Sequence, residues 1–271
     1  MDVAHAAAIL AAGVVAGAVN TVVGAGTLIT FPLLVALGVS PITANVSNTV
    51  GLVPAAVTGA SGYRRELEGQ WRAVVGMAVI SAVGGVAGAA LLLVAPGAFT
   101  TIVPWLLVLA AGLAAIQPRV AEALRRREAL AALAAGTTVT EPPPPALVDA
   151  ITRPLTFGLG LGIALTGIYG GYFGAAQGVI LLALLGIAWS PDLHRANGAK
   201  VVLAGVANLV SAVVFVLSGL VDWRIAGLIA VGSALGGVLG ARIGRRIPAG
   251  VLRVVIVVVG LGAAVTLWAR G

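Results

Sequence analysis

Two apolar stretches of the chain are interrupted by glycine and small polar residues, at Asn20-Thr-Val-Val-Gly-Ala-Gly-Thr27 and at Tyr169-Gly-Gly-Tyr-Phe-Gly-Ala-Ala-Gln-Gly178. In the hydrocarbon of a bilayer, every backbone N–H and C=O needs a hydrogen-bond partner. Residues that loosen a helix are therefore tolerated there only where protein or a watery cavity covers the freed groups. Paired interruptions of this kind are typical of a transporter's binding site, so the sequence predicts a site at both places.

The composition indicates an integral membrane protein. Of the 271 residues, 60% are hydrophobic and only 9% are charged, whereas an average soluble domain has about 25% charged residues. The mean hydropathy is +1.10. The apolar segments are long enough to cross a hydrocarbon core of about 30 Å as helices. We expect an all-α polytopic membrane protein of about 8 transmembrane helices plus broken or re-entrant half-helices.

The chain is internally duplicated. Trp71-Arg72 recurs as Trp223-Arg224, and Gly84-Gly85-Val86 recurs as Gly236-Gly237-Val238, in both cases 152 positions later. The ordered matches divide the chain into a first membrane repeat, 1–117, and a second, 154–271. Between them, 118–153 holds Arg125-Arg-Arg127 and four consecutive prolines from Pro142, so we expect it to be a polar cytoplasmic linker.

Hydropathy predicts matching spans in the two repeats. They cover 4–23, 27–39, 43–61, 73–94 and 99–117 in the first repeat, and 155–173, 177–189, 197–218, 225–241 and 249–268 in the second. The segments 27–39 and 177–189 are too short to cross the hydrocarbon core. They are expected to be half-helices.

The basic residues lie in different, non-equivalent loops in the two repeats. Loop 62–72 carries three arginines, whereas its equivalent, 219–224, carries one arginine and one aspartate. Conversely, 95–98 is uncharged, but its equivalent carries Arg242, Arg245 and Arg246. Because positively charged loops stay on the cytoplasmic side, the pattern predicts two inverted-topology repeats with both termini outside.

Lys200 is the one lysine of the chain, and it opens an apolar stretch. An ammonium at mid-bilayer costs about 2.5–3.5 kcal/mol on insertion scales, which is tolerated mainly where a ligand, cavity or partner accepts the charge. Asn197 lies three residues earlier on the same helical face, and the repeat counterpart of Lys200 is Asn48, close to Asn45. Two interpretations stay open: Lys200 faces a substrate, or it snorkels to the cytoplasmic surface.

The carboxylates favour an anion as the substrate. All nine fall in predicted termini or loops: Asp2, Glu66, Glu68, Glu122, Glu128, Glu141, Asp149, Asp192 and Asp222. Transported metal cations and proton relays usually demand Asp or Glu inside the membrane. Helix N-termini at the glycine breaks would offer N–H groups and a positive dipole end to an anion. Thr27, Tyr169 and Gln177 would add neutral donors.

Several function classes are disfavoured. The chain has no cysteine and two histidines, so we expect no metal site and no cofactor. No nucleophile–base pair is visible within the spans, so we expect no enzyme and no catalytic residue. The sequence pI near 11.2 reflects arginines in short loops beside the spans, where topology accounts for them, and not nucleic-acid binding.

The interruptions and their flanks also resemble a known family. Asn20 to Pro32, followed by Gly38-Val-Ser-Pro41, is similar to the first repeat of the sulfite exporter TauE/SafE family of membrane permeases. Tyr169-Gly-Gly-Tyr-Phe-Gly174 and Ala196-Asn-Gly-Ala-Lys200 are similar to its second repeat. The resemblance covers nearly the whole chain outside 118–153. It implies a multi-pass permease of the bacterial inner membrane that moves sulfur-containing anions such as sulfite, sulfonates or sulfoacetate. The chain departs from the family's glycine-only run at Ala25 and at Ala175-Ala176-Gln177.

We therefore predict alternating access at a midplane anion site between the two repeats. The residues expected to bind the substrate are Asn20, Thr21, Gly24, Gly26, Thr27, Asn45, Asn48, Tyr169, Gly170, Gly174, Gln177, Asn197 and Lys200. The alternatives are an anion channel, a transporter of other small organic anions, and a membrane scaffold without transport. The expected partners are a small anion and the lipid bilayer, and the choice between monomer and homo-oligomer stays open.

Overall fold

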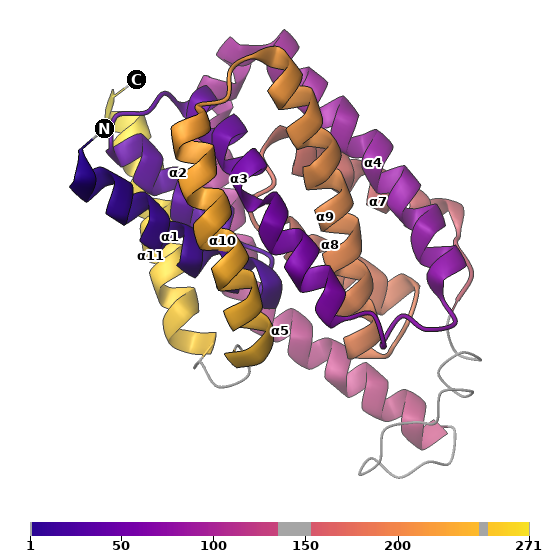
Figure 1. Ribbon diagram of the computed structural model, residues 1–271. Coiled ribbons are helices and arrows are strands. Elements are labelled where there is room, and N and C mark those ends of the chain that lie inside the picture. Colours follow the sequence, from indigo (N-terminus) through magenta and orange to yellow (C-terminus); the bar gives the residue numbers. More distant parts are fainter. Residues whose placement is uncertain (1, 135–152, 244–248, 271) are drawn as a thin grey trace.

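The computed structural model describes residues 2–134, 153–243 and 249–270 of the protein. These residues form helices and no strand (Figure 1). In chain order the helices are α1 (Val3–Val22), α2 (Thr27–Ala36), α3 (Pro41–Gly62), α4 (Trp71–Val94), α5 (Pro96–Ala134), α7 (Phe157–Tyr172), α8 (Gln177–Ala188), α9 (Leu193–Ser218), α10 (Trp223–Ile243) and α11 (Ala249–Arg270). Each predicted span corresponds to one of these helices.

Short polar side chains set where several helices begin. At the start of α9, the Asp192 carboxylate accepts hydrogen bonds from the backbone N–H groups of His194 and Arg195, at 2.8 and 3.0 Å. Before α3, the Ser40 hydroxyl accepts from the Thr43 N–H at 3.2 Å. These caps satisfy N–H groups that have no partner within their own helix. The polar residues between the apolar segments therefore define the helix boundaries.

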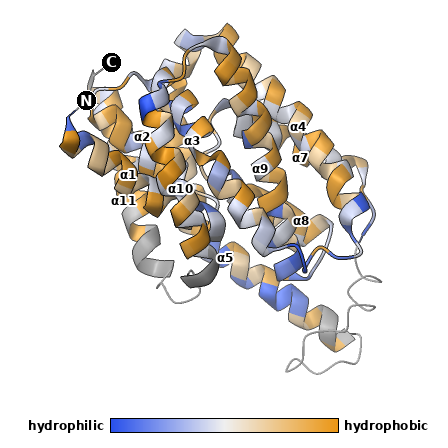
Figure 2. Ribbon diagram, in the orientation of Figure 1, coloured by the Kyte–Doolittle hydropathy of each residue, from blue (hydrophilic) through white to orange (hydrophobic). Residues whose placement is uncertain are grey.

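Several of the described helices have the length and apolar composition of membrane spans. Five are long and apolar enough to cross a membrane, over Val3–Thr21, Trp71–Val94, Pro96–Leu130, Leu193–Ser218 and Trp223–Gly240. Apolar residues cover most of the bundle, and hydrophilic residues concentrate near helix ends (Figure 2). With 10 and 12 residues, α2 and α8 are about 15 and 18 Å long, about half a hydrocarbon core. The prediction of an all-α polytopic membrane protein is confirmed.

The two halves of the sequence pack into each other. Helix α1 packs along α10, and α7 packs along α4. In the same way α3 contacts α10 and α9 contacts α4, while α3 and α9 meet each other and α5 meets α11. Each contact of one half thus has an equivalent after the halves are exchanged. The halves form one interlocked body, and the surface between them runs through its centre.

Glycines allow this close packing. A Cβ built on Gly88 of α4 would lie 2.0 Å from the Ile168 carbonyl oxygen of α7, and one on Gly236 of α10 would lie 1.9 Å from the Val14 carbonyl oxygen of α1. Without a side chain, the backbones of neighbouring membrane helices approach closely. The small-residue pairs that recur in the two repeats are therefore helix contacts.

Helix α5 extends farther than the sequence predicts. It continues to Ala134, so 118–134 of the expected linker is helical, and Glu122 and Glu128 belong to a helix and not to a loop. Leu124 is 2% exposed, and its methyl groups lie 2.6 Å from a Cβ built on Gly186 of α8. The segment is rich in Ala, Leu, Arg and Glu, which favour helix. The consecutive prolines from Pro142 lie outside the described residues.

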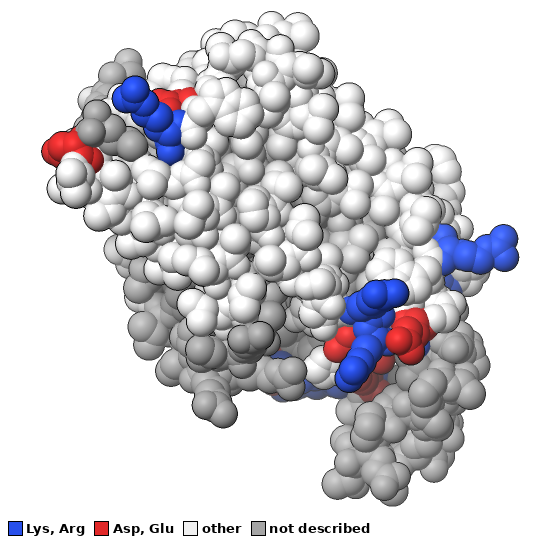
Figure 3. Space-filling view, in the orientation of Figure 1, with Lys and Arg blue, Asp and Glu red and all other residues white. Residues whose placement is uncertain are grey.

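On the face shown in Figure 3, charged side chains gather toward two opposite ends of the body. Both termini lie together at one end, and the connection between α3 and α4 lies at the opposite end (Figure 1). That connection, 63–70, carries Arg64 and Arg65, whose side chains are exposed. The side chain of Arg242 and residues Arg245 and Arg246 lie outside the described part of the chain. The predicted excess of positive charge in the loop between α10 and α11 therefore stays a prediction.

Candidate functional site

The first and second interruptions adopt the same turn. Gly24, with φ +80°, follows the last turn of α1, and Gly174, with φ +73°, follows the last turn of α7. The N–H of Gly24 donates to the Val19 carbonyl at 3.1 Å, and the N–H of Gly174 donates to the Tyr169 carbonyl at 3.0 Å. A left-handed glycine just beyond the last turn is a common way to end a helix. The two positions are 150 residues apart and are repeat equivalents.

The two interruptions meet at the centre of the molecule. The Gly178 N–H donates to the Gly24 carbonyl at 3.4 Å. A Cβ built on Gly24 would lie 2.7 Å from the Cα of Gly178, and one on Gly178 would lie 2.8 Å from the Cα of Gly24. The backbones of the two breaks are thus in direct contact. Residues about 150 positions apart in the sequence form one place in the structure.

A small cavity lies beside this contact. It is lined by residues of α1, α3, α8, α9 and the first break: Asn20, Thr21, Gly24, Ala55, Ala56, Gly178, Lys200, Val201, Ala204 and Gly205. Its volume is ≈ 20 Å³, which is room for about one water molecule. We call it the Lys200 cavity. It brings together Asn20, Thr21, Gly24 and Lys200 of the predicted site.

Lys200 is the charged group of the cavity. It lies seven residues after the start of α9, about 10 Å along the helix axis. Its side chain is 1% exposed, and no group of the described chain accepts a hydrogen bond from its Nζ. An ammonium that snorkels would reach the surface, and this one does not. The Lys200 side chain therefore faces the interior of the bundle and not its surface. Its role in substrate binding stays a prediction.

The other polar atoms at the cavity are neutral. The Thr21 hydroxyl donates to the Gly17 carbonyl of its own helix at 3.1 Å, which leaves its oxygen free to accept. Asn20 is half-buried and lies one residue earlier on α1. The walls are otherwise formed by backbone and by Ala, Val and Gly. The cavity therefore presents one cation among weakly polar surroundings.

Asn48 and Thr27 hold the first half-helix in place. The Asn48 amide donates to the Thr27 hydroxyl at 3.2 Å, and the Thr30 hydroxyl donates to the Asn48 carbonyl oxygen. All three side chains are buried. Because both ends of the Asn48 amide are occupied, this group fastens the start of α2 to α3. It does not line the Lys200 cavity.

At the second break, polar side chains occupy the space beside the backbone, whereas the first break lines the Lys200 cavity. The Gln177 side chain lies over Gly170, since a Cβ on that glycine would be 2.3 Å from Gln177 Nε2. Nε2 donates to the Thr166 carbonyl at 3.2 Å. The Tyr169 hydroxyl donates to the Ala175 carbonyl at 2.5 Å. These side chains satisfy the loosened backbone of the break, and the two halves therefore differ at the centre.

The remaining predicted residues lie apart from the cavity. Gly26 packs against α1, because a Cβ there would be 2.5 Å from the Ala16 carbonyl oxygen. Asn45 is fully buried and donates to the Tyr172 carbonyl of the other half at 3.0 Å. Asn197 is half-buried near the start of α9. None of these three is among the residues that line the Lys200 cavity.

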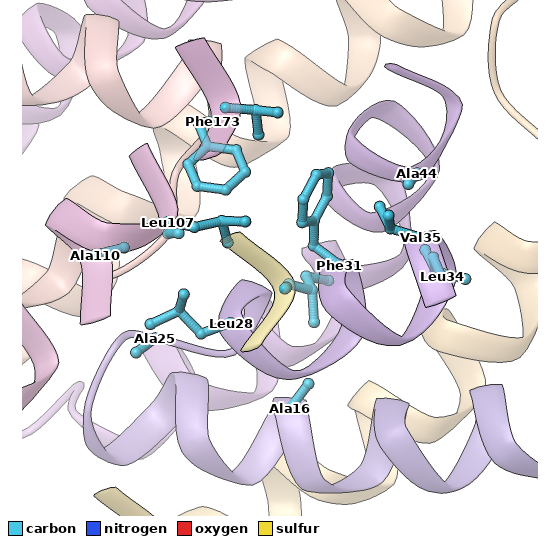
Figure 4. Packing of buried hydrophobic residues seen from close by; sticks show 14 of the residues in the cluster. Ala16, Ala25, Leu28, Phe31, Leu34, Val35, Ala44, Leu107, Ala110 and Phe173 are labelled. Carbon is cyan, nitrogen blue, oxygen red and sulfur yellow. The ribbon is translucent and has the colours of Figure 1, made fainter. Parts of the chain in front are cut away.

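Aromatic rings pack beside the second break. Phe173 lies edge-on to Phe31 of α2, with ring centroids 5.2 Å apart (Figure 4). Phe99 of α5 contacts both Phe173 and Tyr172, at 6.1 and 5.4 Å between centroids. The rings are joined by Leu28 and Leu107 in one apolar cluster. The same cluster includes Ala25 of the first break and Ala175 of the second, so apolar side chains pack directly against both breaks.

Sequence reasoning missed the small residues of the cavity wall. Ala55 and Ala56 of α3 and Ala204 and Gly205 of α9 are ordinary apolar residues in the sequence. A Cβ on Gly205 would lie 3.1 Å from the Cβ of Ala56, so α3 and α9 nearly touch here. Their spacing from Lys200 could have indicated them, because Ala204 and Gly205 follow Lys200 by about one helical turn and so lie on the same face of α9.

Comparison with known proteins agrees with this architecture. The family model "Sulfite exporter TauE/SafE" matches residues 9–267 of the chain. The "Probable membrane transporter protein ORF9" of Sinorhizobium sp. is 26% identical over 262 residues, which cover 95% of this chain and 90% of the relative. No solved structure matches the chain significantly. The match spans both breaks and the helices that form the Lys200 cavity, and the chain accordingly belongs to the TauE/SafE family of membrane transporters.

Proposed function

We propose that the protein is a permease for small sulfur-containing anions of the sulfite, sulfonate or sulfoacetate class, and that the anion binds in the Lys200 cavity. One observation carries the proposal: a buried ammonium that no described protein group neutralises lies where the two breaks meet. A buried charge is stable only when it is paired. A bound anion would supply the missing partner.

The size of the cavity favours a carrier. At ≈ 20 Å³ it holds about one water molecule, which is too little for a sulfonate. The walls must separate for an anion to enter, as they do when two halves move about a central site. Helices α3 and α9, one from each half, pack against each other and both line the cavity, so a separation of these two helices would open it. An anion channel, which needs a standing path, is supported less.

Transport by reconstituted protein tests the proposal. Uptake into proteoliposomes is measured for sulfite, sulfonates, sulfate and carboxylates with wild type and Lys200→Met. Loss of a hydrogen bond to a charged group costs about 1.5–3 kcal/mol, so the variant is expected to take up the transported anion about tenfold more slowly or worse. Arg224→Met removes an exposed arginine at the end of the body and is expected to match wild type.

The outcomes separate the parts of the proposal. Uptake by Lys200→Met equal to wild type for every transported anion would remove Lys200 from the site and leave the transporter assignment standing. Wild-type uptake of carboxylates alone would replace the substrate class with small organic anions. Neither flux nor thermal stabilisation by any anion of the panel would favour the scaffold.

The same proposal places the protein in the bacterial inner membrane. Its relative comes from a bacterium, and the exposed arginines of 63–70 suit the cytoplasmic side. The two termini, at the opposite end of the body, would then lie outside the cytoplasm.

A further inference from the structure

We propose that the protein is an anion exchanger, in which the loaded carrier changes between its inward and outward forms much faster than the carrier without an anion. This inference rests on the proposed function and adds to it the mode of transport. It follows from the neutral residues that line the Lys200 cavity and from the positions of the carboxylates in the described residues.

The first step concerns the groups that face Lys200. Helix α1 contributes Asn20 and Thr21, and the remaining lining residues from α3, α8, α9 and the first break are glycine, alanine and valine. All of these are neutral. Of the two polar side chains, the Thr21 hydroxyl already donates its hydrogen to Gly17. None of the residues that line the cavity carries a negative charge.

The second step concerns the carboxylates. In the described residues they lie at helix ends or in connections: Asp2 caps α1, Asp192 caps α9, Asp222 precedes α10, Glu66 and Glu68 lie between α3 and α4, and Glu122 and Glu128 lie in the extension of α5. The ion pairs His5–Asp2 and Arg126–Glu122 lie at the surface. Within residues 2–134, 153–243 and 249–270, therefore, no carboxylate accepts a hydrogen bond from the Lys200 ammonium.

The third step concerns the movement itself. The cavity lies between α3 and α9 and beside the Gly24–Gly178 contact, so a change of access carries Lys200 through a state closed on both sides. With a monovalent anion bound, that state contains a neutral pair. Without the anion it contains an isolated buried charge, which is strongly unfavourable. Return of the carrier therefore requires an anion from the other side.

The test compares wild-type proteoliposomes that contain unlabelled sulfite with vesicles that contain none. Radiolabelled sulfite is added outside, and valinomycin with equal potassium on both sides holds the membrane potential at zero. A second pair of vesicles uses ethanesulfonate as both internal and external anion. We expect the loaded vesicles to take up label about tenfold faster or more, because breaking a buried charge pair carries a large penalty.

Three outcomes count against the inference. Equal uptake into loaded and unloaded vesicles would show a uniporter and leave the proposed function intact. Unloaded vesicles that reach the loaded rate when the outside is made acidic would show that Lys200 gives up its proton and that anion and proton move together. No uptake of either probe into either kind of vesicle would remove the proposed function together with the exchange.

Variants of Lys200 test independently whether its charge causes the difference between loaded and unloaded vesicles. Lys200→Gln removes the charge, so the ratio of loaded to unloaded uptake should fall toward one even where both rates are lower. Lys200→Arg keeps the charge and should keep a high ratio. Arg224→Gln, at an exposed position, should leave rate and ratio unchanged. A ratio in Lys200→Gln as high as in wild type would overturn the role given to the charge. If Lys200→Gln takes up no label, the wild-type comparison decides alone.

Discussion

The contact between Gly24 and Gly178 leaves no room for a side chain on either residue. Two reasons require glycine at position 24: the contact with Gly178, and a φ of +80° that is unfavourable for other residues. Gly178 lies at the start of α8, where only the contact excludes a Cβ. The two glycines therefore have different reasons to be glycine, although they face each other.

Gly178→Ala is expected to destabilise the protein. The added methyl group would meet backbone at 2.8 Å, and overpacking of this kind costs about 1–3 kcal/mol. The melting temperature in detergent should fall, and transport should fall with it. Gly227→Ala of α10 is the matched control, because a Cβ there meets nothing within 4 Å and alanine favours helix. A melting temperature of Gly178→Ala equal to that of Gly227→Ala would show that the breaks do not touch.

At the scale of elements, the half-helices α2 and α8 are fastened in different ways. The start of α2 is tied to α3 through Asn48, Thr27 and Thr30. The start of α8 is tied to α7, because Gln177 donates to Thr166. The sequence predicted Asn48 as a ligand because it is the repeat counterpart of Lys200, and Gln177 because it is a neutral donor at the second glycine break. Their partners explain why polar residues lie here without lining the cavity.

The extension of α5 makes the second prediction at this scale. Leu124 packs on Gly186 of α8 and is 2% exposed, whereas Leu130, in the same segment, is 66% exposed. Leu124→Ala should lose about 2–5 kcal/mol of packing and release the extension, and Leu130→Ala should not. Limited trypsin digestion after Arg125, Arg126 and Arg127 measures this release. Equal cleavage of the two variants would mean that the extension is not docked on α8.

At the scale of the molecule, interlocked packing makes the interface between the halves the core of the protein. The Ser81 hydroxyl donates to the Leu203 carbonyl at 3.0 Å, and its equivalent, Ser233, donates to the Gly51 carbonyl at 2.6 Å. Both bonds join one half to the other at positions related by 152 residues. Movement between the halves must therefore preserve or exchange these contacts.

The orientation in the membrane is the prediction at this scale. The chain has no cysteine, so labelling of a single introduced cysteine shows on which side of the membrane that residue lies. Glu68→Cys should react with a membrane-impermeant maleimide only from the cytoplasm, and Leu220→Cys only from outside, because the two connections belong to inverted repeats. A reporter fused after Gly271 should be active only outside. Labelling of both cysteines from the same side, or a cytoplasmic reporter, would contradict inverted topology.

Helix positions and class could be predicted because they depend on local properties. Apolar runs, polar caps and glycine breaks act over a few residues, and each predicted span corresponds to a helix. The exception is 118–134, where proline and charge resemble a linker, but the residues after Pro118 favour helix and Leu124 docks it on α8. A docking contact with a helix more than 60 residues away has no local signal.

The amino-acid order was sufficient for the membrane class and for the two breaks, because these follow from hydropathy and glycine. It was not sufficient for the site. Which face of α1 or α9 points inward depends on how the helices are rotated against partners far away in the chain. That rotation directs Asn20, Thr21 and Lys200 to one cavity, turns Asn48 and Gln177 to other helices, and makes Ala56 and Gly205 part of the wall.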